Sequence, residues 1–365
     1  MLSSLDLLRV VHVSPTYFAP ESVLGGGERF AEELARAMAL RATSAEVKLV
    51  SFGPRAFRER PAPRFERVIL RSWTDARKVP FSPALARELR GADVIHCHQY
   101  FVLPTFLAAL LGRLRGSRVF VSDLGGGGWT PGYHVDQSRW ITAHLPISEY
   151  AARELPGRNR LHRRHRVIYG GVDPHLYPMR PEPAHDGSLV FLGRVLPHKG
   201  IHFLIEGLPP GVVLHVVGPQ TDPAYLERLQ ARAAGREVTF HGALPDGEVR
   251  ALLGRAMALV HPTPVDEHGS AGVHELFGLA LVEAMARGCP VIASDAASLP
   301  EIVTPEVNGF LVPPNRPQAI GEAILRLRDD PALWARLSVG ARRTVEERFT
   351  WEGVVERCLE AYAEP

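Results

Sequence analysis

The chain has 365 residues, and its 42 lysines and arginines nearly balance its 40 aspartates and glutamates, for a formal net charge of +2. This balance argues against a nucleic-acid-binding protein, which usually carries a clustered excess of basic residues. The length exceeds the size at which a single hydrophobic core usually divides, so we expect two domains. Three cysteines, far apart in the chain, suggest neither a disulfide framework nor a zinc site.

The N-terminus leads directly into an apolar, strand-like run, without the basic flank or the cleavage site of a secretory signal. No stretch approaches the roughly 18 to 20 uninterrupted apolar residues that a membrane-spanning helix needs. We therefore expect a cytoplasmic protein, with peripheral contact at the inner face of the membrane as an alternative.

Short apolar runs rich in β-branched residues alternate with longer segments of helical period. This alternation predicts parallel strands joined by crossover helices. The carboxyl ends of such strands line a crevice in which ligands bind. In the first half of the chain we expect strands at residues 8–14, 45–52, 92–98 and 118–123, and helices at 28–40 and 104–114.

A Gly- and Pro-rich segment at residues 167–178 precedes a second series of the same kind. The chain is therefore predicted to be an α/β protein with two Rossmann-like domains, at residues 1–169 and 170–349, followed by a helical segment at 350–365. Gly170 and Gly171 would form either a hinge or a rigid turn at the boundary. In the second half we expect strands at 189–194, 212–218, 238–242, 258–263, 290–295 and 309–313, and helices at 247–257, 279–288 and 351–362.

A run of three glycines, Gly25, Gly26 and Gly27, ends the loop after the first strand and is followed by Glu28. Glycines there allow backbone amides and a helix N-terminus to approach an anion closely, so this loop is a candidate for binding an anionic ligand. A flexible turn is the alternative. A dinucleotide site is disfavoured because the GxGxxG spacing is absent and the second strand ends near Ser51 rather than at an acid.

Two cations follow the predicted strand at 189–194. Arg194 comes directly after its apolar residues, and Lys199 lies five residues later in a loop closed by Gly200. At the carboxyl end of a strand such a pair suits a pyrophosphate, which Arg binds through its planar fork and Lys as a point charge. Without further context, a solvated loop would account for the same residues.

Two acids, Glu275 and Glu283, have seven residues between them, and Gly278 indicates the start of a helix. With the rise of a helix, the acids would lie on the order of 12 Å apart. That is too far to share a proton, but it suits the hexose and the ribose of a nucleotide sugar whose pyrophosphate lies at the helix N-terminus. Two ordinary helix glutamates are the alternative.

In their order and spacing, these motifs resemble those of family 4 of the retaining glycosyltransferases, which have the two-Rossmann-domain architecture called GT-B. The resemblance implies two facing domains with the donor cleft between them, and a final helix that packs back on the first domain. It covers nearly the whole chain, through the Gly-rich loop, DVIHCH, FLGRVLPHKG, VTFHGALP, the E-x7-E segment, EAMARGCPVIAS, PEIVTPEVNGFLVPP and FTWEGVVERCLEAY.

The resemblance also implies roles for individual residues. Arg194 and Lys199 would neutralise the donor diphosphate. Glu283 would bind ribose hydroxyls, and Glu275 would hold the transferred sugar. Further donor contacts are implied for the backbone near Phe277, Gly278 and Leu279, and for the loop of Gly242, Ala243 and Leu244, which would seat the base.

In the first domain, His98 ends a strand and is expected to point into the cleft, with His96 deeper on the same side. Core histidines are the alternative for both. After the next strand the family usually has a T-x-H-G-like segment whose histidine reaches the donor sugar, but this chain has SDLG at residues 122–125. Either Asp123 replaces that histidine or the contact is lost.

The implied reaction is retaining transfer of a hexosyl group from a UDP-sugar or GDP-mannose to a glycan, lipid or small-molecule acceptor, as in polysaccharide biosynthesis. Cleavage of the donor builds charge on the leaving diphosphate, and a metal or fixed cations must stabilise it. The chain contains no D-x-D pair of the kind that metal-dependent transferases use. We therefore expect no metal and no cofactor, with Arg194 and Lys199 serving instead.

Several alternatives stay open. A nucleotide-sugar-binding protein that has lost catalysis would explain the missing histidine, and a sugar phosphorylase or an epimerase could have the same architecture. An NAD-dependent oxidoreductase is opposed by the absent fingerprint. The densest basic run is a candidate contact with anionic lipid headgroups, or else a solvated helix face. Its arginines are Arg158, Arg160, Arg163, Arg164 and Arg166.

Overall fold

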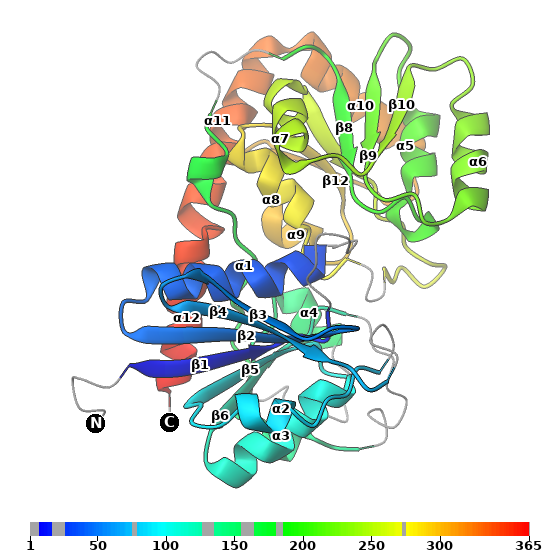
Figure 1. Cartoon of the computed structure of the whole chain (residues 1–365). Coiled ribbons are helices and arrows are strands. Elements are labelled where there is room, and N and C mark those ends of the chain that lie inside the picture. The colour runs from blue at the N-terminus through cyan, green and yellow to red at the C-terminus, as the bar shows by residue number, and fades with distance from the viewer. Residues whose placement is uncertain are drawn as a thin grey trace. The chain divides into compact units, whose positions relative to one another are not determined.

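The computed structural model describes residues 7–16, 26–74, 79–125, 135–154, 164–179, 185–271 and 275–364. The chain divides into two compact units (Figure 1). Unit 1 comprises Met1–Gly170 and Trp351–Pro365, and unit 2 comprises Gly171–Thr350. Each unit contains one sheet with helices on its faces, so the predicted α/β class is confirmed. Among the described residues, no helix has the length and apolar character needed to cross a membrane.

The sheet of unit 1 has seven strands in the order β3-β4-β2-β1-β5-β6-β7. All neighbouring strands are parallel except β3 and β4, which form an antiparallel pair at one edge. This pair was not predicted from the sequence, because β3 is exposed and carries a proline and three charged residues. The strands are β1 (Leu8–Val13), β2 (Ala45–Gly53), β3 (Phe57–Ala62), β4 (Phe65–Arg71), β5 (Val94–His98), β6 (Arg118–Ser122) and β7 (Ala143–His144).

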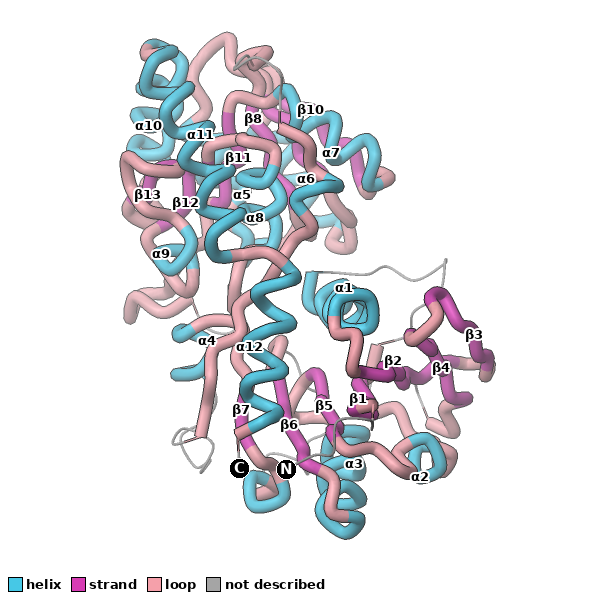
Figure 2. The backbone as a smooth tube through the Cα atoms, turned by 90° about the vertical axis from the view of Figure 1, so that its left-hand side faces the viewer, coloured by secondary structure: helices cyan, strands magenta, loops and turns pink. Residues whose placement is uncertain are grey.

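Helices cover both faces of this sheet: α1 (Gly26–Arg41) and α12 (Trp351–Ala363) lie on one face, and α2 (Leu85–Glu88) and α3 (Leu103–Arg115) on the other (Figure 2). A short helix, α4 (Glu149–Glu154), follows β7. The α1 helix buries Phe30, Leu34 and Met38, which recur every four residues and so form one apolar stripe.

Side chains of the last helix, α12, form hydrogen bonds with the rest of unit 1. The Tyr362 hydroxyl lies 2.6 Å from Nδ1 of the buried His96, and Trp351 Nε1 donates to Glu33 at 3.1 Å. Arg357 Nε donates to the carbonyl of Ile168 at 2.9 Å. Since Tyr362 and Trp351 are also buried, this helix is part of the core of unit 1 although it ends the chain.

The sheet of unit 2 has six strands, all parallel, in the order β10-β9-β8-β11-β12-β13. The chain enters at β8, runs outward to β10 and returns to β11 on the other side of β8. This is the order of a doubly wound Rossmann fold. The strands are β8 (Leu189–Leu192), β9 (Leu214–Val217), β10 (Val238–Gly242), β11 (Ala258–His261), β12 (Val291–Ser294) and β13 (Gly309–Val312).

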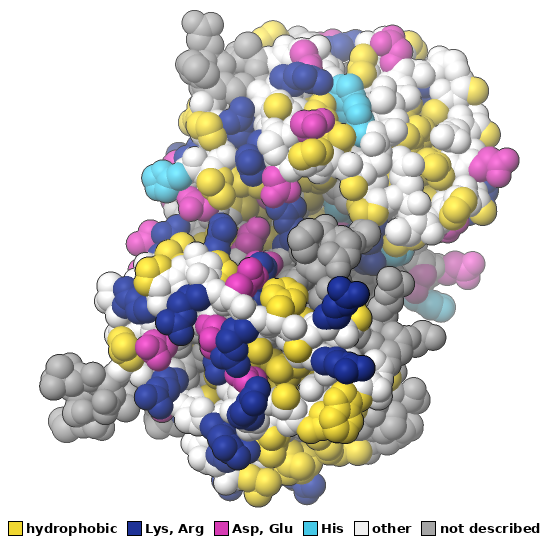
Figure 3. All heavy atoms as spheres, in the orientation of Figure 1, with side chains coloured by type: hydrophobic (Ala, Val, Ile, Leu, Met, Phe, Trp, Pro, Cys, Tyr) yellow, Lys and Arg dark blue, Asp and Glu magenta, His cyan; other side chains and the backbone are white. Residues whose placement is uncertain are grey.

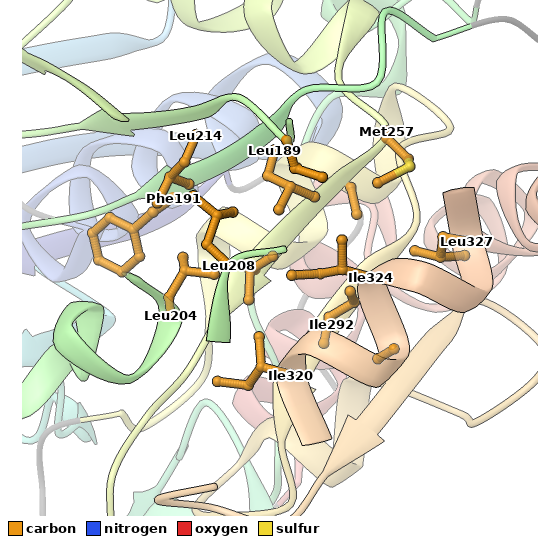
Figure 4. Packing of buried hydrophobic residues seen from close by; sticks show 14 of the residues in the cluster. Leu189, Phe191, Leu204, Leu208, Leu214, Met257, Ile292, Ile320, Ile324 and Leu327 are labelled. Carbon is orange, nitrogen blue, oxygen red and sulfur yellow. The ribbon is translucent and has the colours of Figure 1, made fainter. Parts of the chain in front are cut away.

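The main core of unit 2 lies between its sheet and the helices α5, α6, α10 and α11. Strand residues such as Leu189 and Ile292 meet Leu204, Ile320 and Ile324 from α5 and α10 (Figure 4). Each of these side chains contributes about 1.5–3 kcal/mol on full burial. The helices of unit 2 are α5 (Ile201–Gly207), α6 (Pro223–Arg232), α7 (Asp246–Arg255), α8 (Leu279–Ala286), α9 (Leu299–Ile302), α10 (Pro317–Asp329) and α11 (Pro331–Arg348).

Replacement of Tyr362 by Phe should destabilise unit 1, because Nδ1 of the buried His96 loses its hydrogen-bond partner. We expect the free energy of unfolding to fall by about 1–3 kcal/mol, the usual cost of an unsatisfied buried polar group. Urea denaturation followed by circular dichroism measures this change. Val339→Ala, at a position that is 56% exposed, is the control. An unchanged stability for Tyr362→Phe would show that this hydrogen bond does not hold α12.

Candidate functional site

The candidate site of unit 2 lies at the carboxyl ends of β8 and β11. These strands are adjacent, but the chain leaves β8 toward one side of the sheet and leaves β11 toward the other. At such a switch point the loops diverge and leave a crevice, where open α/β sheets bind their ligands. Side chains that follow β8 and β11 are therefore placed to meet a common ligand.

The loop after β8 carries both predicted cations. Arg194 is exposed, and no side-chain partner for it occurs in the described parts of the chain. Lys199 is largely buried, at 9% exposure, and ends a 3-10 turn (Pro197–Lys199) before Gly200. Gly200 has φ of 69°, and a Cβ there would lie 1.9 Å from the carbonyl oxygen of Pro262. Only glycine allows this loop to pack so closely against the chain that follows β11.

A buried ionic cluster joins three segments of unit 2. Nζ of Lys199 donates to Oε2 of Glu275 at 2.7 Å, and Nε2 of His261, the last residue of β11, lies 2.6 Å from the same oxygen. Glu275 is 7% exposed and His261 is 3% exposed. Burial alone would raise the pKa of Glu275, but the charges and hydrogen bonds of Lys199 and His261 hold it well below its usual range. The carboxylate is therefore an acceptor, and His261 Nε2 donates to it.

The segment between Glu275 and α8 is held by Ser298, whose hydroxyl contacts the carbonyls of Glu275 and Phe277 at 3.0 and 2.8 Å. Gly278 then adopts φ of 108° and caps α8. The amides of Gly278 and Leu279 lie at the start of this helix, where backbone donors have no acceptor within the helix. They are available to an anion, as in other helix N-terminal sites.

Glu283 is half-buried and lies within α8. Because α8 begins at Leu279, Glu275 precedes the helix, and the helical rise applies only to the last part of the segment between the two acids. The separation of about 12 Å, which was expected from helical rise, therefore stays a prediction.

The predicted base-binding loop follows β10. Gly242 ends that strand with φ of 70°, Ala243 is exposed and Leu244 is half-buried. Two strand spacings separate β10 from β8, which corresponds to about 10 Å at the usual distance between strands. The loop thus lies at the same edge of the sheet as Arg194.

In unit 1, the described residues Gly26 and Gly27 form the start of α1. Gly25 and the side chain of Glu28 lie outside the described residues. Asp123 is half-buried, and its Oδ1 accepts a hydrogen bond from the Tyr100 amide at 3.2 Å. Burial raises the pKa of Asp123 to about 6, against two backbone hydrogen bonds that lower it.

His98 belongs to a cluster of completely buried imidazoles at the end of β1 and β5. Its Nε2 lies 3.0 Å from Nδ1 of His12, and its ring stacks on His96 with centroids 4.7 Å apart. His96 in turn contacts Tyr362 and Ser122 through its two nitrogens. Burial lowers the pKa of His12 to about 3 and those of His96 and His98 well below the usual range, so all three are neutral.

This cluster could offer a metal one nitrogen from each ring, within 4.8 Å of one another. Both nitrogens of His96 already form hydrogen bonds, one of which a metal would have to break, whereas Nε2 of His12 and Nδ1 of His98 have no hydrogen-bond partner among the described residues. The contact of His98 with a donor sugar stays a prediction, since its side chain has no exposed surface.

The basic run is only partly described: Arg158, Arg160 and Arg163 lie outside the described residues. Arg166 forms ion pairs with Glu360 of α12 and with Glu364, which follows the end of that helix. Its charge is therefore compensated within unit 1.

Two residues of this site, His261 and Ser298, were not predicted from the sequence. The signal for His261 is a histidine at the end of an otherwise apolar strand, the same pattern that pointed to His98. Two buried polar atoms near the end of this strand have no hydrogen-bond partner among the described residues. They are the hydroxyl of Thr263 and Nδ1 of His261. Ser298 lies far from Glu275 in the sequence, and its contact depends on tertiary folding.

Comparison with known proteins gives two family matches. Residues 24–176 match the model described as Glycosyltransferase Family 4, and residues 180–344 match the model described as Glycosyl transferases group 1. The chain is 26% identical over 305 residues to an uncharacterized glycosyltransferase of Methanocaldococcus jannaschii, covering 74% of this chain and 75% of that protein. It is 30% identical over 205 residues to glycogen synthase of Mycobacterium tuberculosis, covering 54% of this chain and only 47% of that enzyme.

Solved structures match nearly the whole chain. Sucrose-phosphate synthase from Thermosynechococcus elongatus aligns with a TM-score of 0.75 at 22% identity, over 97% of this chain and 98% of that one. HepE from Anabaena, solved in complex with UDP-glucose, aligns with a TM-score of 0.71 at 19% identity, over 96% of this chain and 98% of that one. At these identities the likeness establishes the fold alone.

Replacement of Glu275 by Gln should destabilise unit 2 by about 3–5 kcal/mol at neutral pH, because it leaves Lys199 buried without its counter-charge. The folded-state pKa of Glu275 lies below the unfolded value of about 4.3. The ionised carboxylate of Glu275 therefore makes its full contribution to the free energy of unfolding above about pH 5. This contribution is lost as the pH falls below 4. The difference in unfolding free energy between wild type and Glu275→Gln should shrink between pH 7 and pH 3.

Urea denaturation at several pH values measures this difference. Glu248→Gln, an exposed change in the first turn of α7, is the control and should show a small, pH-independent difference. A difference for Glu275→Gln that stays constant down to pH 3 would contradict the assigned ion pair.

Proposed function

The chain belongs to family 4 of the glycosyltransferases, and from this premise we propose that it transfers a hexosyl group from a UDP-sugar or GDP-sugar to a glycan, lipid or small-molecule acceptor. We propose that the transfer retains the anomeric configuration and needs no metal. The observation that carries the proposal is the buried cluster of Lys199, Glu275 and His261 beside the exposed Arg194, at the switch point of a Rossmann sheet.

In this proposal Arg194 and Lys199 bind the diphosphate of the donor. Arg194 has its full charge available, and Lys199 is held in position by Glu275. The amides at the start of α8 add fixed dipoles on the same anion. Together they stabilise the charge that develops on the leaving diphosphate, without reorganisation at the moment of reaction. A divalent metal would then be unnecessary.

Glu275 would hold the transferred sugar. Its carboxylate has a second oxygen, Oε1, while Oε2 receives Lys199 and His261. A carboxylate with a lowered pKa accepts hydrogen bonds and is a poor base, so it suits a sugar hydroxyl better than a proton-transfer role. The acceptor proton would pass to the leaving diphosphate as the acceptor attacks from the same face, and no protein nucleophile is needed.

The nucleoside would extend from the diphosphate toward β10. Glu283 on α8 would bind the ribose hydroxyls, and the loop of Gly242, Ala243 and Leu244 would seat the base. The UDP-glucose complex of HepE supports a uridine donor by fold analogy. Glycogen synthase, by its name, supports a sugar acceptor in general and does not identify a particular one.

We expect one class of nucleoside diphosphate to stabilise the protein in the presence of EDTA. At 100 times its dissociation constant, a ligand should add about 2.7 kcal/mol to the folded state. Thermal unfolding with UDP, GDP, ADP and their sugars measures the effect and identifies the base. In Arg194→Gln the shift should fall, while Arg343→Gln, an exposed change on α11, should leave it intact.

With the matching nucleotide sugar, release of the nucleoside diphosphate should be about a hundredfold slower in Arg194→Gln, the usual loss for one preorganised donor to a developing charge. Stabilisation without any release, with sugars or glycerol offered as acceptors, would favour a binding protein over an enzyme. No stabilisation by any nucleotide would contradict the proposed donor site.

A further inference from the structure

A cavity of about 300 Å³ lies in unit 1, at the edge of the sheet where β1 and β2 begin. The turn between β3 and β4 and the loop between α2 and β5 complete its walls. His98 and Asp123 lie at the opposite, carboxyl edge of the same sheet. A strand of six residues separates the two edges by about 20 Å. The cavity is therefore distinct from the residues of unit 1 that were assigned to the donor.

Part of the charge in the cavity wall is neutralised internally. Glu88, with a side chain only 3% exposed, pairs with Lys48 at 3.0 Å and with Arg58 at 2.9 Å. Glu66 pairs with Arg58 at 2.8 Å and lies 3.8 Å from Lys48. Although burial would raise the pKa of Glu88, Lys48 and then Arg58 lower it, so the carboxylate is ionised. Arg87 also contacts Glu88, at 3.3 Å, so three cations compensate these two acids. Of the five residues, Lys48, Glu66 and Glu88 line the cavity.

The rest of the wall carries a surplus of positive charge. Four arginines, Arg9, Arg60, Arg64 and Arg90, line the cavity opposite a single further acid, Glu46. In the described parts of the chain, none of these five residues forms an ion pair, although the side chain of Arg64 donates to the Thr43 carbonyl. Basic side chains also gather on the face of unit 1 that Figure 3 displays.

The backbone helps to place one of these arginines. Gly91, in the loop between α2 and β5, has φ of 71°, and a Cβ there would lie 3.2 Å from a terminal nitrogen of Arg9. The absence of a side chain at Gly91 therefore lets the guanidinium of Arg9 lie close against the loop. The register of β1 and β2 places Arg9 beside Glu46 and Val11 beside Lys48. Arg9 therefore lies at the edge of the sheet where β1 and β2 begin, and it lines the same cavity as Arg60 and Arg90.

We propose that this cavity binds a phosphate monoester, with Arg9, Arg60 and Arg90 as the phosphate ligands. Guanidinium forks match the oxygens of a phosphate, and three of them without a carboxylate partner favour a dianion. The volume is at the lower end of that of small-molecule sites. The group could belong to a small soluble molecule or to a lipid headgroup. This binding goes beyond the proposed glycosyl transfer and does not depend on it.

Isothermal titration of the full-length protein with glycerol 3-phosphate at low salt tests the soluble form of the ligand. Wild type should bind one equivalent, and Arg60→Gln combined with Arg90→Gln should weaken binding by at least about tenfold, since each lost charged hydrogen bond costs that much or more. Sedimentation with vesicles of phosphatidic acid, against phosphatidylcholine alone, tests the lipid form. The same pair of changes should abolish it.

Two controls separate this site from general electrostatics and from the donor site. Arg36→Gln with Arg113→Gln removes two charges from exposed positions of α1 and α3 and should not affect either measurement. Arg194→Gln should leave glycerol 3-phosphate binding intact. The proposal is overturned if wild type binds neither probe, if the Arg60 and Arg90 changes have no effect, or if either control reduces binding as much.

Discussion

The position of one carboxylate organises the candidate site. Oε2 of Glu275 accepts hydrogen bonds from two side chains. One is Lys199, in the loop after β8, and the other is His261, at the end of β11. Three segments distant in sequence are thereby joined at the switch point of the unit 2 sheet. A buried carboxylate is tolerated only with such partners, because the loss of its hydration costs several kcal/mol. The loops on either side are then constrained to the conformations that bring these partners together.

Glycines and one serine supply those conformations. Gly200 allows the Lys199 loop to pass against Pro262, and Gly278 turns the chain from Glu275 into α8. The hydroxyl of Ser298 hydrogen-bonds to the carbonyls of Glu275 and Phe277, in the segment that precedes α8. Apolar residues of the same size often match or exceed buried ion pairs in stability. We therefore propose that the charges of this cluster serve a ligand.

The sequence was sufficient where a signal is local. Apolar runs predicted most strands, and Arg194 and Lys199 were proposed as site residues because they follow a strand end, and Glu275 because of its spacing from Glu283. The sequence did not predict contacts between residues that lie far apart in the chain. The pairing of His261 with Glu275 and the contact of Ser298 follow from packing, and the edge strand β3 lacks the apolar pattern that identifies buried strands. The separation expected for Glu275 and Glu283 stays a prediction, because a glycine-capped turn precedes α8 and helical rise covers only part of that segment.

The near-neutral composition of the chain similarly conceals local charge. Four arginines surround the cavity of unit 1 with one uncompensated acid, while nearby Lys48 and Arg58 are neutralised by Glu66 and Glu88. At the other edge of the same sheet, three neutral histidines and Tyr362 form a buried network with α12. Unit 1 therefore places charge at one edge of its sheet and neutral hydrogen bonding at the other.

The most direct test of the ionic cluster is to replace all of it at once with apolar residues of similar size, Lys199→Met, Glu275→Leu and His261→Phe. If the cluster serves a ligand rather than the fold, the triple variant should unfold at the same urea concentration as wild type or a higher one, and should lose stabilisation by nucleoside diphosphates. A variant that is strongly destabilised, yet is still stabilised by the nucleotide as wild type is, would contradict this assignment.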